Sequence, residues 1–88
     1  MSGKANTPEG VREVTDLEMM ENPEWWPNGF YLPLKQPKWR TAVLMSWDTD
    51  VYLLWEDMTM FDKLPTDKAE RLNRDQLQSV IDRGWVVD

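Results

Sequence analysis

The clearest hydrophobic pattern in the chain lies between residues 39 and 57, where two apolar runs flank a short polar turn. Residues 39–47 (WRTAVLMSW) and residues 51–57 (VYLLWED) are rich in β-branched and aromatic side chains, and Asp48-Thr49-Asp50 separates them. Such runs favour strands, and a three-residue connection favours a β-hairpin with one turn residue in the left-handed conformation. We expect Asp50 at that position, because aspartate tolerates it.

Pairing residues across this turn predicts the register of the hairpin. One face would hold only apolar pairs, and the opposite face would be mixed. The apolar pairs are Trp47–Val51, Met45–Leu53 and Val43–Trp55, and the mixed pairs are Ser46–Tyr52, Leu44–Leu54 and Ala42–Glu56. A slip of one residue would scramble this division, so we expect a firm register and a hairpin that is at least partly covered on both faces.

Two helices are predicted, one on each side of the hairpin in the sequence. Thr7 is placed as the N-cap of the first helix, followed by Pro8 and Glu9, and Asn22-Pro23 ends it. Its apolar stripe recurs every three residues and consists of Val11, Val14, Leu17 and Met20.

The second helix begins at Asn73, with Gln76 placed to reach back to this N-cap. Its buried face is formed by Leu77, Val80 and Ile81. Gly84 fits the left-handed position after the helix, and Trp85 then folds back onto the last turn. Residues 85–88 are long enough for a short final strand.

Residues 22–38 carry a proline every four to six positions, and aromatic and leucine residues lie between them. The prolines are Pro23, Pro27, Pro33 and Pro37. This density excludes a regular helix and a central strand. An extended, aromatic segment of this kind packs against its own domain or against a partner.

Length and composition bound the fold. A chain of 88 residues forms one domain at most, and its lack of cysteine and histidine excludes disulfides and the usual transition-metal sites. Six tryptophans compensate, since each can bury about 150–250 Å². We expect residues 1–7 to be disordered, and residues 8–88 to form a small α+β domain in which a short antiparallel sheet packs with a C-terminal and an N-terminal helix.

Charge and hydropathy restrict the partners. The net charge of −6 disfavours a nucleic-acid partner bound through phosphate neutralisation. No apolar run is long enough to cross a bilayer, and residues 1–8 lack the apolar stretch of a signal peptide. We therefore expect a soluble, cytoplasmic protein with no membrane partner.

Little in the sequence indicates a metal site or a catalytic site. Asp48 and Asp50 lack the further oxygen ligands and the glycine of a calcium loop, and aspartate is common in turns. Glu56 and Asp57 are neighbours on a strand, so their side chains should point to opposite faces rather than converge on one substrate. We expect no enzymatic activity, no metal and no cofactor.

The tryptophans divide into two groups. Trp47, Trp55 and Trp85 have packing positions on the hairpin and after the last helix. The other three are Trp25, Trp26 and Trp39, for which core and interface remain open. Two adjacent tryptophans rarely share one pocket, so one of the first two should face outward. We take as candidate partner-binding residues Trp25, Trp26, Trp39, Glu56, Asp57, Met58 and Met60, the last four from an acidic, methionine-containing run.

Three short motifs resemble small uncharacterised proteins encoded by bacteriophages. They are Asn22-Pro-Glu-Trp-Trp-Pro27, Leu32-Pro-Leu-Lys35 and Gly84-Trp-Val-Val-Asp88. The resemblance implies no activity and no catalytic residues, but it indicates a phage accessory protein that acts inside a bacterial cell.

The function predicted from the sequence is therefore a non-enzymatic, acidic protein-binding module, encoded by a phage, that modulates or inhibits a host protein. The expected partner is a host protein or a phage protein. The alternative is a small virion or assembly component that self-associates through the same aromatic surface.

Overall fold

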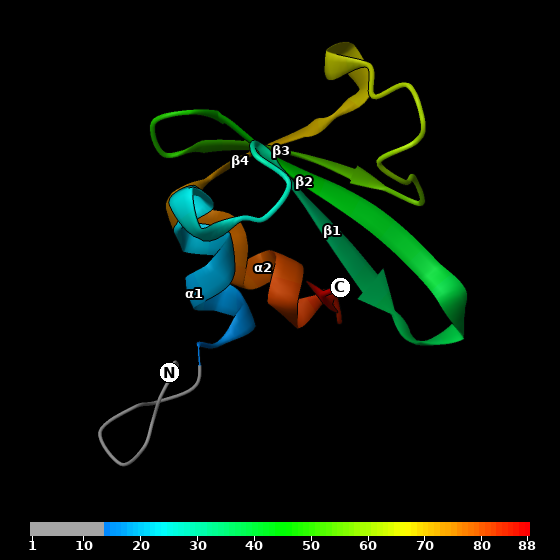
Figure 1. Ribbon diagram of the computed structural model, residues 1–88, viewed down its shortest axis with the longest axis horizontal. Helices are drawn as coiled ribbons and strands as arrows, with labels where there is room; N and C mark the ends of the chain where they lie inside the picture. The colour runs from blue at the N-terminus through cyan, green and yellow to red at the C-terminus, as the bar shows by residue number, and fades with distance from the viewer. Residues whose placement is uncertain (1–13) are drawn as a thin grey trace.

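The computed structural model describes residues 14–88, which form an α+β domain with a five-stranded antiparallel sheet and two short helices on one of its faces (Figure 1). The strands are β1 (Tyr31–Gln36), β2 (Arg40–Asp48), β3 (Val51–Glu56), β4 (Glu70–Asn73) and β5 (Val86–Val87), in the spatial order β4-β3-β2-β1-β5. The helices are α1 (Asp16–Glu21) and α2 (Leu77–Asp82). The expected disorder of residues 1–7 and the helix start at Thr7 lie outside the described residues.

The predicted hairpin register is confirmed for five of the six pairs. The exception is Trp47, because a bulge between Ser46 and Asp48 places Asp48 opposite Val51. Asp50 takes the left-handed conformation, with φ of 60°. The bulge leaves Trp47 about half exposed, so its expected packing position on the hairpin is wrong.

Both faces of the hairpin are covered, as expected. The mixed face carries the larger core, in which Leu44 and Leu54 pack with Met20 of α1 and Val80 of α2. The apolar face carries a smaller cluster of Val43, Leu53 and Trp55, covered by the connection from residue 57 to residue 69. The Trp55 indole N–H ties this connection to the sheet by donating to the carbonyl oxygen of Pro65 at 2.8 Å.

The proline-rich segment forms an inner strand, which the sequence prediction excluded. β1 lies between β2 and β5, with Pro33 opposite Val43. The Pro33 carbonyl faces the other way and accepts from the backbone N–H of Asp88 at 3.0 Å. The nitrogen and carbonyl of a strand residue point to the same side, so the missing N–H faces the two-residue edge strand and removes no bond to β2.

The helix ends follow local capping. α1 begins after Thr15, whose hydroxyl accepts from the backbone N–H of Glu18 at 3.1 Å, while the Glu18 carboxylate accepts from the N–H of Thr15 at 3.2 Å. This reciprocal cap is visible in the sequence as Thr-x-x-Glu, but Thr7 was predicted instead.

The end of the chain matches the prediction. The Gln76 side chain accepts a hydrogen bond from the backbone N–H of Asn73 at 2.8 Å. The chain then passes through a short 3₁₀ turn, η4 (Arg74–Gln76), into α2. Gly84 has φ of 94°, and the backbone N–H of Trp85 donates to the carbonyl of Val80 at 3.3 Å. β5 then completes the sheet, so the expected last strand is confirmed, whereas β4 was not predicted.

Candidate functional site

The connection between β1 and β2 presents a tryptophan to solvent in an unfavourable backbone conformation. It contains the 3₁₀ turn η2 (Pro37–Trp39), in which Lys38 has φ of 70° and Trp39 has φ of 68°. The Trp39 side chain is 97% exposed. The left-handed region costs about 1–2 kcal/mol for a residue with a Cβ, so turns of this kind favour asparagine and glycine. The turn therefore destabilises the fold, and burial of its tryptophan does not offset this cost.

We expect the double variant Lys38→Asn with Trp39→Gly to be more stable than the natural chain by about 1–2 kcal/mol, because it relieves this strain. Urea denaturation at neutral pH measures the difference. Trp39→Ala is the matched control: it removes the ring and keeps a Cβ, so its free energy of unfolding should stay within about 0.5 kcal/mol of the natural value. A double variant no more stable than this control would contradict the strain.

Two adjoining pockets lie beside this turn. The first, of about 480 Å³, is lined by Pro33 of β1 and by Met60 and Phe61 of the connection after β3. The second, of about 470 Å³, is lined by residues 35–41, Trp39 among them. Thr41 and Asp88 line both pockets, so the two are neighbours. Phe61 is fully exposed. We call this region the tip surface, formed by Lys35, Lys38, Trp39, Thr41, Met60 and Phe61.

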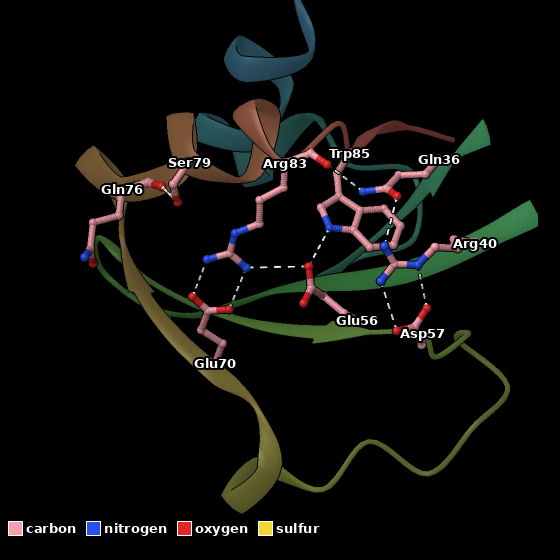
Figure 2. A network of polar contacts seen from close by, with 9 residues as sticks. All are labelled: Gln36, Arg40, Glu56, Asp57, Glu70, Gln76, Ser79, Arg83 and Trp85. Carbon is pink, nitrogen blue, oxygen red and sulfur yellow. Dashed lines mark hydrogen bonds and ion pairs between the residues drawn. The ribbon is translucent and has the colours of Figure 1, made fainter. Parts of the chain in front are cut away.

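A network of charged side chains lies around the buried Trp85 (Figure 2). The indole N–H donates to Glu56 Oε2 at 2.8 Å, and the Arg40 guanidinium lies 4.9 Å from the ring centre. Arg40 in turn donates to both carboxylate oxygens of Asp57, at 2.9 and 3.0 Å. Arg83 completes the network with Glu70, at 2.7 and 2.6 Å, and with Glu56, at 3.6 Å.

Glu56 and Asp57 were expected to point to opposite faces of the sheet, but both side chains belong to the same polar network. The left-handed backbone of Asp57, with φ of 63°, ends the strand alternation, and both carboxylates join the network around Trp85. Because these two predicted partner-binding residues already contact arginine or indole donors of their own chain, they act in the fold as polar contacts that hold the hairpin and the end of α2 together.

This network makes stability depend on pH. Hydrogen bonds from Arg83 hold the pKa of Glu70 below its ordinary value, and hydrogen bonds from Arg40 do the same for the pKa of Asp57. Both carboxyl groups thus bind a proton more weakly in the folded state. Their stabilisation is complete above about pH 5 and is lost as the pH falls through the lowered values.

We therefore expect the urea midpoint to fall on acidification from pH 7 to pH 3, and to fall less for Glu70→Gln, which has already lost this titrating group. Asp67→Asn, a change at an exposed acid outside the network, should keep the full decrease. An equal decrease in Glu70→Gln and in the natural chain would contradict the role of the Glu70–Arg83 pair.

The remaining predicted partner-binding residues lie in different places. Trp25 is 49% exposed in the 3₁₀ turn η1 (Pro23–Trp25), whereas Trp26 is 5% exposed and belongs to the core. The expectation that one of this pair faces outward is confirmed. Met58 packs on the smaller core cluster, and Met60 also lines the tip surface. Of the predicted partner-binding residues, Trp39 and Met60 line the tip surface, one in each of its two neighbouring pockets. The structure adds Phe61, which was not selected from the sequence.

Three further findings concern the same residues and the chain as a whole. Between residues 14 and 88, no group of three acidic side chains is placed to hold a metal ion. No helix in that range is long and apolar enough to cross a membrane. Comparison with known proteins finds no family model that matches the chain, and no curated sequence or solved structure with significant similarity to it.

Proposed function

We propose that this chain is a non-enzymatic protein-binding module that docks on its partner through the tip surface. The observation that carries the proposal is Trp39, a residue that is 97% exposed and has a left-handed backbone. Tryptophan is among the residues most enriched at binding hot spots. Strained backbone that persists without a packing reason is a feature of ligand-binding segments.

The surroundings of Trp39 support the same role. Met60 and the fully exposed Phe61 line a pocket of about 480 Å³, which shares Thr41 and Asp88 with the pocket that Trp39 lines. An exposed apolar patch of this kind, rimmed by polar residues, is typical of an interaction site. An aromatic anchor next to a pocket is also the arrangement in which a partner side chain becomes fully desolvated.

The proposal extends to the setting in which the module acts. The resemblance of three short motifs to small phage proteins favours a bacterial host protein in the cytoplasm as the partner, which the module would modulate or inhibit. The absence of histidine and cysteine from the sequence favours binding over catalysis.

Quantitative capture from a bacterial lysate tests the proposal. The natural chain, Trp39→Ala and Trp25→Ala are immobilised at equal density, and bound proteins are compared by mass spectrometry. We expect Trp39→Ala to lose at least about tenfold of a specific partner, as for a hot-spot tryptophan, while Trp25→Ala retains it. Equal capture by Trp39→Ala and the natural chain would contradict the proposal.

Sedimentation separates this function from self-association. We expect the free chain to remain monomeric at micromolar concentration. A stable oligomer that Trp39→Ala dissociates would contradict a separate partner, and it would favour the assembly component considered from the sequence.

A further inference from the structure

We propose that the segment recognised by the tip surface is an extended, acidic stretch of polypeptide with one large apolar side chain. This inference rests on the proposed function and names the chemistry of the partner. The apolar side chain would enter the pocket beside Met60 and Phe61. The carboxylates would lie at the neighbouring pocket, where Lys35 and Lys38 flank Trp39.

The basic side chains of the tip surface favour an acidic ligand. The whole chain has a net charge of −6, yet Lys35, Lys38 and Arg40 line one pocket within six residues of sequence. Lys35 lies 3.5 Å from Asp88, and both side chains are about half exposed. An exposed pair of this kind contributes about 0–1 kcal/mol, so an incoming carboxylate can replace Asp88 at little cost.

The shape of the tip surface favours an extended polypeptide segment. The two pockets share Thr41 and Asp88 in their linings and differ in character: Met60 and Phe61 line the first, and Lys35, Lys38 and Arg40 line the second. An extended chain advances about 3.3 Å per residue and places successive side chains on alternate sides. Such a segment can therefore fill the apolar pocket and also reach both lysines within a few residues.

The same charges disfavour a nucleic acid. Arg40 is held by both carboxylate oxygens of Asp57, so Lys35 and Lys38 are the basic side chains of this pocket that a ligand would meet. A phosphate backbone would bring a charge at every nucleotide towards a protein that is negative overall. A peptide with a few carboxylates brings less charge and also offers an apolar side chain for the first pocket.

The test is selection from a display library of random twelve-residue peptides. The immobilised full-length chain serves as bait, and Trp39→Ala serves for counter-selection. We expect the enriched peptides to be rich in aspartate and glutamate around one large apolar residue. Enriched peptides that are basic or neutral would overturn the acidic partner, as would the absence of any enrichment.

Affinities of one selected peptide complete the test. The double variant Lys35→Glu with Lys38→Glu should bind it at least about tenfold more weakly, since two attractive contacts become repulsive. The matched control is Lys63→Glu with Lys68→Glu, which makes the same change of net charge at exposed lysines that do not line the tip surface, and it should bind nearly normally. Equal weakening in both variants would show a general charge effect and overturn the site.

Two other outcomes are informative. Tighter binding of single-stranded oligothymidine than of the selected peptide, lost in Lys35→Glu with Lys38→Glu, would overturn the peptide in favour of a nucleic acid. If lysate capture depends on Trp39 but no acidic peptide competes with it, the proposed function stands and only the chemistry of the partner is wrong.

Discussion

Trp85→Ala should lower the free energy of unfolding by about 3–5 kcal/mol, the usual range for removing a buried tryptophan. The Trp85 ring is fully buried in the larger core cluster. Its N–H is the hydrogen-bond partner of Glu56, and its ring lies under the Arg40 guanidinium. The substitution therefore opens a cavity and also leaves a carboxylate without one of its donors. A small domain has a total stability of about 5–15 kcal/mol, so this loss removes a large share of that stability.

Urea denaturation followed by circular dichroism measures the loss, with Trp85→Phe as the comparison. Phenylalanine retains most of the apolar packing but cannot donate to Glu56, so we expect a smaller loss of about 1–3 kcal/mol. If Trp85→Ala cost no more than Trp85→Phe, Trp85 would not be an anchor of the core.

Trp26→Ala should produce a loss of similar size, about 3–5 kcal/mol. The Trp26 indole N–H donates to the carbonyl oxygen of Met19 at 2.6 Å and so joins η1 to the end of α1. Its ring lies 6.2 Å from that of Tyr52 in a tilted arrangement. Removing the ring takes away both the packing between α1 and the sheet and the bond that fixes the following turn.

The adjacent Trp25 provides the matched control, because the same substitution one position earlier removes a half-exposed ring. Trp25→Ala should change the free energy of unfolding by less than about 1 kcal/mol. Equal losses in the two variants would mean that Trp25 and Trp26 share the packing, which contradicts the division described above.

The hairpin was the part of the fold that the sequence predicted best. A slip of one residue between β2 and β3 would scramble the division into apolar and mixed pairs, so the pairing of Val43 with Trp55 follows from the local pattern. The pattern does not show the bulge at Trp47, because a bulge depends on how the turn closes. It also does not predict β4, a four-residue strand with one buried side chain, Leu72.

Contacts between distant residues explain most of the other differences. The Arg40–Asp57 pair spans 17 residues and the Arg83–Glu70 pair spans 13, so neither follows from local spacing. Pro33 is tolerated in an inner strand because its missing N–H faces β5, which is too short to need that hydrogen bond. The sequence does not indicate that β5 would be so short.

The candidate site was only partly predictable for a similar reason. Trp39 was selected for its residue type, but nothing in Lys38-Trp39 indicates a left-handed turn, because those residue types disfavour it. The same disagreement between local preference and structure is what singles out Trp39 as a binding residue.

Hydrogen exchange of the indole N–H groups, observed by NMR on the uniformly ¹⁵N-labelled chain, distinguishes the tryptophans that pack in the fold from the one that is exposed for binding. The indoles of Trp26, Trp55 and Trp85 donate to Met19, Pro65 and Glu56, so we predict slow exchange for these three. Trp39 is almost fully exposed and should exchange in the fastest class. A protected Trp39 indole, or a Trp85 indole that exchanges as fast as Trp39, would contradict the account.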